Sequence, residues 1–183
     1  MTQVWEYIQS DCYRYTGKKL SIFKLFTKAI FGTNHCFRYS FWMRMASRKG
    51  LSGFFARRLH RHYTIKYGIQ IPHTTKIGYG FYIGHGVGII INSGTTIGNN
   101  VNISQFLSIG TNKHTPATIG DNVYIGPNVC IVEDVKIGSN TIVAAGAIVI
   151  RDIPENSTAV GCPAKVIGDN KHPEYVQNRW DVE

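Results

Sequence analysis

The sequence lacks the features that mark secreted, metal-stabilised and membrane-spanning proteins. Its four cysteines are widely spaced and none forms a C-x-x-C pair, which argues against a disulfide framework and against a zinc site. No run approaches the roughly 20 apolar residues that span a bilayer, and the N-terminus carries no recognisable signal peptide. We therefore expect a cytoplasmic protein that holds no metal. The cysteines are Cys12, Cys36, Cys130 and Cys162.

Acidic residues are scarce in the first third of the chain. Residues 1–70 hold 13 Lys and Arg against 2 Asp and Glu, whereas residues 71–183 hold 7 against 9. The two parts therefore carry +11 and −2, which together give the formal net charge of +9. The excess positive charge belongs to the N-terminal region alone.

The chain does contain a repeat with a six-residue step. Thirteen aliphatic residues recur in it, and glycine follows many of them, as in Ile77-Gly78 and Ile97-Gly98. This spacing is unsuited to an amphipathic helix but suits short strands joined by turns, where glycine supplies positive φ. The pattern predicts a mainly β solenoid over residues 71–168 with a stacked aliphatic core, and a β-sandwich with coincidental spacing is the alternative. The thirteen residues are Ile71, Ile77, Ile83, Ile91, Ile97, Ile103, Ile109, Ile119, Ile125, Ile131, Ile137, Val143 and Val149.

This repeat resembles that of the hexapeptide acyltransferases. The resemblance implies a left-handed parallel β-helix with three repeats in each triangular coil, a homotrimer, and active sites between subunits. The closing motif at residues 161–168, GCPAKVIG, is typical of members that use coenzyme A, so acetyl-CoA is the implied co-substrate. Lys165 would meet its phosphate charge, and small residues would leave a slot for its pantetheine arm. The small residues are Gly126, Ala144, Ala145 and Gly146.

The six-residue step is interrupted twice, and both interruptions contain a histidine. The first, at residues 84–88, adds two residues around His85, and the second, at residues 110–116, adds four around His114. Residues outside the repeat are not needed to pack the coils, so they are free to bind a ligand or to take part in catalysis. Acetyl transfer to a hydroxyl needs a base, and the unperturbed pKa of histidine, about 6.5, suits that task. His85 is our candidate base, with backbone N–H groups of its glycine neighbours as oxyanion donors.

Residues 71–88 resemble the segment of serine acetyltransferases that carries the catalytic histidine, and His85 matches that position. In that family one aspartate directly precedes the histidine and binds the ammonium group of the amino acid. A second aspartate, fifteen residues upstream, orients the imidazole. Gly84 and Gln70 stand at these positions here. Gln70 is predicted to orient His85 through its side-chain carbonyl.

The acceptor is predicted from the missing aspartate. Gly84 offers no counter-charge to an ammonium group, whose unpaired desolvation is costly. The sequence is also similar to family members from exopolysaccharide and capsule biosynthesis, which favours a neutral sugar hydroxyl, with serine O-acetylation for cysteine synthesis as the alternative. Lys113 and His114 resemble the family's Arg-His pair that holds the acceptor, although an exposed basic loop is equally compatible. The predicted acceptor-binding residues are Gly84, Lys113 and His114.

Residues 1–70 are predicted to be a helical region, with Asn34 or Ser52 as N-caps. Aromatic residues alternate with Lys and Arg in it, as at residues 54–58. One interpretation is a cap over the open end of the solenoid. The other is a surface for an anionic membrane, at its inner face, or for an anionic lipid-linked glycan. Nucleic acid is not an expected partner, because no nucleic-acid motif accompanies the charge.

Two further features leave alternatives open. Residues 169–183 are predicted to be a tail outside the repeat, either covering the coenzyme A site or mobile. A non-catalytic solenoid of the carbonic-anhydrase type would need three histidines converging on zinc, whereas only His85 and His114 lie in the interruptions.

Overall fold

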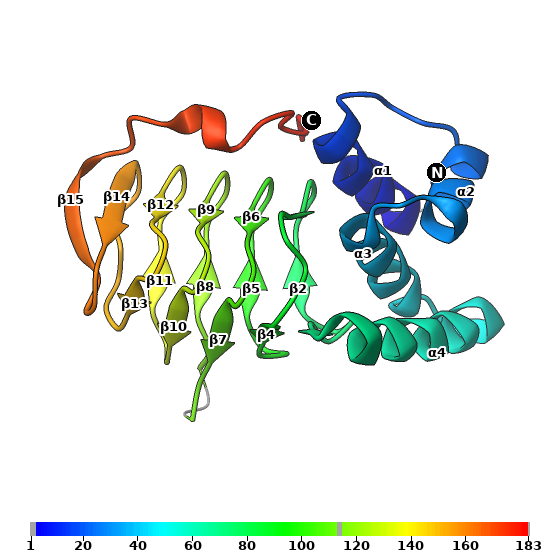
Figure 1. Cartoon of the computed structure of the whole chain (residues 1–183), viewed down its shortest axis with the longest axis horizontal. Helices are drawn as coiled ribbons and strands as arrows, with labels where there is room; N and C mark the ends of the chain where they lie inside the picture. The colour runs from blue at the N-terminus through cyan, green and yellow to red at the C-terminus, as the bar shows by residue number, and fades with distance from the viewer. Residues whose placement is uncertain (1–2, 113–114, 183) are drawn as a thin grey trace.

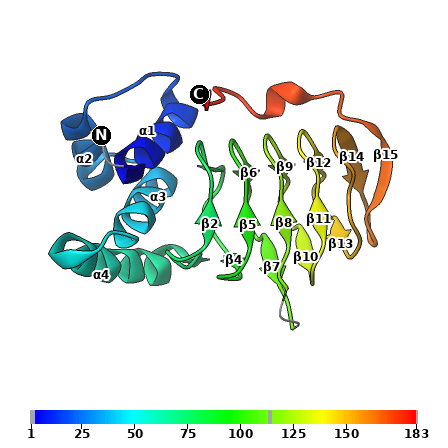
Figure 2. The same cartoon turned by 180° about the vertical axis from the view of Figure 1, so that it is seen from behind.

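The computed structural model describes residues 3–112 and 115–182. Four helices lie beside one end of a stack of short strands, which supports the cap interpretation (Figures 1 and 2). The helices are α1 Gln3–Thr16, α2 Ile22–Phe31, α3 His35–Ala46 and α4 Gly50–Tyr67. No helix within the two described ranges is long and apolar enough to cross a membrane.

The strands form three sheets, and the coils from β1 to β12 each contribute one strand to each sheet in turn. The β1 sheet contains β1 Ile69–Gln70, β4 Ile89–Ile91, β7 Ser108–Gly110, β10 Cys130–Val132 and β13 Ile148–Val149. The β2 sheet contains β2 Lys76–Ile77, β5 Thr96–Ile97, β8 Thr118–Ile119 and β11 Lys136–Ile137. The β3 sheet contains β3 Tyr82–Ile83, β6 Asn102–Ile103, β9 Tyr124–Ile125, β12 Ile142–Val143, β14 Ser157–Val160 and β15 Lys165–Asp169. All pairings are parallel except that of β14 with β15. The predicted parallel β-helix is confirmed, and its left-handed sense remains an expectation from the resemblance.

The core is the predicted aliphatic column. All thirteen residues of the six-residue repeat are buried. The register places equivalent positions on neighbouring coils opposite each other, as with Ile77 and Ile97, and again Ile97 and Ile119. Stacking of like side chains therefore buries apolar area that no coil could bury alone.

The predicted use of glycine is wrong for the Ile-Gly pairs. Gly78, Gly98, Gly120 and Gly126 do not have positive φ. A Cβ on each of them would lie 2.7 Å from backbone of the next coil, so glycine is needed there for close stacking. Positive φ at the corners is adopted largely by asparagine, whose short side chain tolerates the left-handed region. These are Asn100, Asn122, Asn128, Asn140 and Asn156.

Gly120→Ala tests this account of the coil stacking. We expect the free energy of unfolding to fall by about 1–3 kcal/mol, because the added methyl must displace the backbone of the next coil. Gly110→Ala is the matched control, since no atom of the described residues lies within 4 Å of a Cβ at Gly110. Urea denaturation measures both variants, and equal midpoints for the two would contradict the account.

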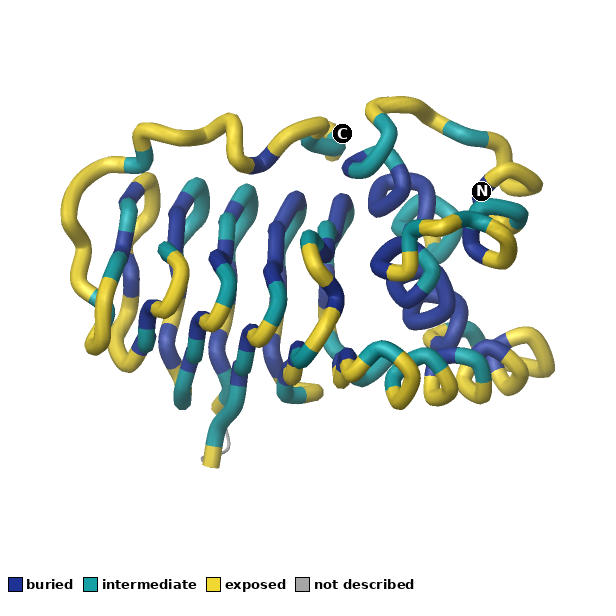
Figure 3. Tube along the Cα trace, in the orientation of Figure 1, coloured by how far each residue is buried: buried dark blue, intermediate teal, exposed yellow. Residues whose placement is uncertain are grey.

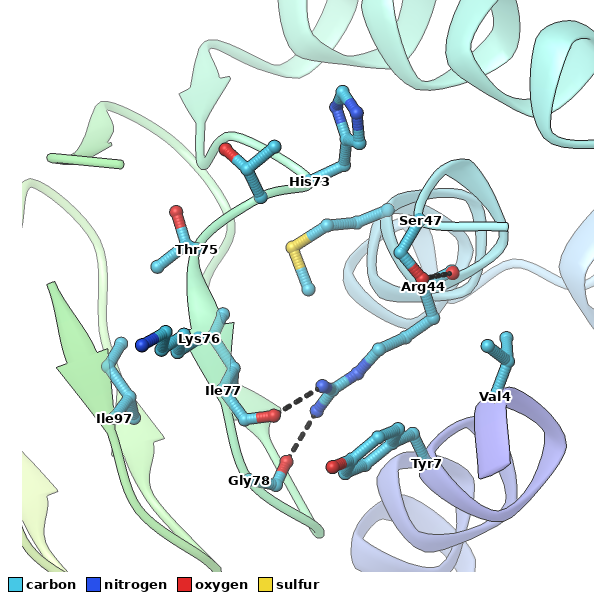
Figure 4. A pocket seen from close by; sticks show the side chains of 12 residues that line it. Val4, Tyr7, Arg44, Ser47, His73, Thr75, Lys76, Ile77, Gly78 and Ile97 are labelled. Carbon is cyan, nitrogen blue, oxygen red and sulfur yellow. Dashed lines mark hydrogen bonds between the residues drawn. The ribbon is translucent and has the colours of Figure 1, made fainter. Parts of the chain in front are cut away.

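The helical region is tied to the first coil by a buried ion pair. The Asp11 carboxylate accepts from Arg44 Nε at 2.9 Å and from Phe81 N at 2.9 Å. The Arg44 guanidinium also donates to Ile77 O and Gly78 O, each at 2.7 Å (Figure 4). One carboxylate and one guanidinium therefore join α1, α3 and the solenoid.

The boundaries in this region agree only partly with the sequence predictions. Asn34 caps α3 as predicted, since its Oδ1 accepts from Phe37 N at 2.9 Å. Ser52 is not a cap, because α4 begins before it and has Lys49 at the N-cap position. The first strand starts at Ile69, just before the boundary predicted after residue 70.

Candidate functional site

His85 lies in the loop that leads from β3 to β4. Its side chain is exposed, whereas Ile83 and Ile89 on either side are buried. The loop is held close to the helices, because a Cβ on Gly86 would lie 2.8 Å from Ile69 Cδ1 and 3.0 Å from Cys36 Sγ. The break in the repeat therefore presents a histidine to solvent on a tightly packed loop.

A pocket of about 280 Å³ opens beside His85 and Gly84. Its other walls come from three parts of the chain, and no carboxylate is among the described residues that line it. The main contributors are Arg14 of α1, Tyr82, Asn102 and Tyr124 of the β3 sheet, and Tyr175 and Gln177 of the tail.

Arg14 places a fixed cation at this pocket. It is buried and donates through Nε to Gln177 O at 2.7 Å and through Nη1 to Gly80 O at 2.6 Å. Its Nη2 donates to Asn102 Oδ1. Burial lowers the pKa of Arg14 to about 10, which leaves it charged at neutral pH. Sequence analysis missed this residue, since nothing near Arg14 in the chain indicates that α1 reaches the first coils.

Tyr15, the next residue of α1, fixes the strand that precedes His85. Its hydroxyl accepts from Ile83 N and donates to Ile83 O, both at 3.0 Å. Burial raises the pKa of Tyr15, so the phenol stays neutral and can serve both backbone groups. Two neighbouring residues of one helix thus shape the surroundings of His85.

The C-terminal tail runs back along the solenoid towards the helices (Figure 1). It contains a short 3₁₀ helix, η1 Pro173–Tyr175, and its backbone accepts from coil asparagines. Asn102 Nδ2 donates to Tyr175 O at 2.9 Å, and Asn100 Nδ2 donates to Trp180 O at 3.0 Å. The tail therefore forms a wall of the pocket at His85, which was not among its predicted roles.

The residues predicted to bind coenzyme A share one corner of the solenoid with His85. The loops from β3 to β4, from β9 to β10 and from β12 to β13 each join the β3 sheet to the β1 sheet. His85 lies in the first loop, Gly126 in the second, and Ala144, Ala145 and Gly146 in the third. Ala145 and Gly146 are exposed there, whereas Gly126 is already required for packing on the next coil.

Lys165 follows the turn that closes this corner after the last coil. It is exposed and begins β15, and Ala164 N just before it donates to Ile148 O at 2.8 Å. The corner between the β3 and β1 sheets thus runs from His85 to Lys165. Binding of coenzyme A along it stays a prediction.

Gln70 lies away from the pocket at His85. It is exposed on β1 and lines a different pocket, together with Arg61, Thr64 and Ile90. Within the described residues no hydrogen bond joins Gln70 to His85. The structure of a single chain therefore lends no support to an orienting role for Gln70.

Lys113 and His114 lie outside the described residues. The described ends of their segment belong to β7 and β8, which lie in the β1 and β2 sheets. This segment therefore leaves the solenoid at another corner than the loop of His85.

A larger pocket, of about 360 Å³, lies between α1, α3 and the first coil (Figure 4). Its cation Arg44 is already bound to Asp11 and to the carbonyls of Ile77 and Gly78. We regard this pocket as part of the junction between helices and solenoid. Among the described residues, no group of three or more His, Cys, Asp or Glu could hold a metal ion.

Residues 116–151 match the family model for the bacterial transferase hexapeptide, six repeats. The chain carries a hexapeptide transferase domain. This domain is similar to serine acetyltransferase 4 of Arabidopsis thaliana, with 39% identity over 56% of this chain and 30% of that protein. It is also 44% identical to the putative acetyltransferase YJL218W of Saccharomyces cerevisiae over 50% of this chain and 54% of that protein. The chain thus spans about a third to a half of these relatives.

The hexapeptide domain and its helices together resemble a solved serine acetyltransferase. The structure of the Neisseria gonorrhoeae enzyme in complex with serine matches with a TM-score of 0.71 and 25% identity, over 91% of this chain and 70% of that one. A match over 91% of this chain includes the helices as well as the solenoid and the tail. The hexapeptide domain is therefore of the serine acetyltransferase-like branch, as the sequence predicts.

Proposed function

We propose that this protein is an acetyl-CoA-dependent O-acetyltransferase with His85 as the general base. The observation that carries the proposal is the exposed His85 on a fixed loop beside a pocket, in a solenoid of the serine acetyltransferase-like branch. The acceptor binds in that pocket, and the acetyl thioester reaches the loop along the corner that leads to Lys165.

The reaction needs no covalent enzyme intermediate. His85 removes the proton of the acceptor hydroxyl as its oxygen attacks the thioester carbonyl carbon. The carbon–sulfur bond then breaks, and the proton held by His85 passes to the departing sulfur. The products are an O-acetyl ester and free coenzyme A. Backbone N–H groups near the loop stabilise the oxyanion between the two steps.

We propose a homotrimer as the active assembly. The support is geometric, because the interruption at residues 110–116 joins the β1 and β2 sheets, whereas the loop of His85 joins the β3 and β1 sheets. In a homotrimer, the interruption of a neighbouring copy would complete the pocket at His85.

Serine is the acceptor that the comparisons favour. The similar protein of Arabidopsis thaliana is named serine acetyltransferase 4, and the Neisseria gonorrhoeae structure is of a serine acetyltransferase in complex with serine. The sequence favoured a sugar in surface-polysaccharide synthesis, with serine as the alternative, so the comparisons support the alternative more strongly. On this proposal the hydroxyl of serine is the attacking group.

A sugar hydroxyl is the second candidate, because the pocket contains a cation and no described carboxylate. Arg14 would oppose an ammonium group there, whereas it tolerates a neutral sugar and attracts an anionic one. Serine therefore requires negative charge at the pocket, whereas a neutral or anionic sugar does not.

Gly84→Asp separates the two acceptors. A Cβ at Gly84 would meet no atom closer than 3.5 Å, so the pocket can hold the side chain. If serine is the acceptor, we expect its KM to fall about tenfold, because the carboxylate pairs with the ammonium group. Thiol release from acetyl-CoA measures turnover with serine and with sugars, and His62→Asp, at an exposed position of α4, is the control. Activity of the unaltered protein with sugars alone would refute the serine assignment.

A further inference from the structure

The α2 helix presents large apolar side chains to solvent. Phe23 and Phe31 are 76% and 81% exposed, whereas Leu25 and Ala29 on the opposite side are buried. Lys24 and Lys28 lie along one edge of the apolar face, between it and the buried side, on a helix of 3.6 residues per turn. This distribution is typical of helices that lie in the plane of a membrane surface.

The α4 helix carries a similar face. Leu51 is 78% and Ile65 is 75% exposed, and Phe55 lies on the same side. Arg58 and Arg61 are also exposed and interleave with them. Apolar and cationic side chains therefore alternate along α4, and its exposed surface is both apolar and positively charged.

These two faces lie in the half of the molecule away from β15. Figures 1 and 2 place α2 and the start of α4 at the end of the molecule opposite the last coil, and Figure 3 shows exposed residues along both helices. We call the exposed faces of α2 and α4 together the basic end. None of the described residues that line the pocket at His85 belongs to α2 or α4, so docking of the basic end would not use the lining of that pocket.

Among the described residues, no salt bridge joins a Lys or Arg of the basic end to a carboxylate. Glu6 and Asp11 are the acidic residues of the described part of residues 3–70, and Asp11 is buried against Arg44. A second copy placed on this surface would bring like charges together. The occupant must therefore be anionic and must also accept exposed Phe, Leu and Ile side chains.

We propose that the basic end docks on an anionic phospholipid bilayer. Phe23, Phe31, Leu51 and Phe55 enter the boundary between headgroups and acyl chains, and the surrounding Lys and Arg contact lipid phosphates. An anionic bilayer can accept both kinds of side chain, because its phosphates lie at the surface and its acyl chains lie just below them. The proposal does not depend on the acetyltransferase activity.

Sedimentation with vesicles tests the proposal on the full chain. We expect binding to vesicles that contain phosphatidylglycerol, little binding to phosphatidylcholine alone, and release as salt is raised. The double variant Phe23→Ser/Phe31→Ser should weaken binding about tenfold or more, since two aromatic anchors are lost. Lys24→Glu/Lys28→Glu and Arg58→Glu/Arg61→Glu should each do the same.

Ile167→Ser is the matched control, because Ile167 is 67% exposed but lies on β15 at the other end of the chain. It should bind vesicles as the unaltered protein does. Equal binding of neutral and anionic vesicles, or unchanged binding of all three double variants, would overturn the proposal. So would a smaller assembly of Phe23→Ser/Phe31→Ser in sedimentation velocity without lipid, because the occupant would then be a second copy. Thiol release from acetyl-CoA should be unchanged in the three double variants, which separates this proposal from the proposed function.

Discussion

His85→Ala should lower the kcat of acetyl transfer by about two to four orders of magnitude, the range expected for loss of a general base. The acceptor hydroxyl is a weak nucleophile until its proton is removed, and His85 is the exposed base on the loop beside the pocket. The KM for acetyl-CoA should change little, because the imidazole acts mainly in the transition state.

His62→Ala provides the control for this prediction, since His62 is also exposed but lies on α4. Both variants should show the circular dichroism and the assembly size of the unaltered protein. Steady-state thiol release then gives kcat for each. A His85→Ala enzyme that keeps within about twofold of normal kcat would rule out His85 as the base.

Asp11→Ala should lower the free energy of unfolding by about 3–5 kcal/mol. The substitution leaves the buried Arg44 guanidinium without its counter-charge and removes the acceptor of Phe81 N. Since Arg44 also joins α3 to the carbonyls of Ile77 and Gly78, we expect the helices to loosen from the first coil.

Urea denaturation monitored by circular dichroism measures this effect. Glu174→Ala is the control, because the pair of Glu174 with His172 is exposed and should contribute little. Equal midpoints for Asp11→Ala and Glu174→Ala would show that the buried pair is not what holds the helices to the solenoid.

The solenoid could be predicted because its rule is local. Each coil needs an inward aliphatic side chain every six residues, so residues such as Ile97 and Ile131 can be recognised by their spacing alone. All thirteen residues recognised in this way are buried. The reason for the neighbouring glycines could not be found in this way. Gly98 is fixed by the backbone of the next coil, a contact between residues far apart in the sequence.

The candidate site was predictable only where it interrupts the repeat. His85 stands out because its loop breaks the six-residue step, and the structure places it on a pocket. Arg14 and Gln177 lie near the two ends of the chain and meet at that pocket. No motif in the sequence around either residue predicts this. The family resemblance suggested Gln70 as an orienting residue, but in the structure it faces another pocket.

The charge of the pocket bears directly on the acceptor. The sequence shows that Gly84 replaces a carboxylate, whereas only the fold brings the buried cation of Arg14 to the same pocket. The relatives favour serine, whereas this charge favours a neutral or anionic hydroxyl compound. Direct measurement of acceptor use is therefore the most informative experiment on function.

The central claim is acetyl transfer from acetyl-CoA to a hydroxyl, and thiol release from acetyl-CoA by the purified protein tests it most directly. Serine, free sugars and nucleotide sugars are offered in turn, and the O-acetyl product is identified by mass spectrometry. The account predicts acceptor-dependent thiol release with one ester formed for each thiol, and its loss in His85→Ala. Thiol release that no hydroxyl acceptor stimulates, or that persists unchanged without His85, would contradict it.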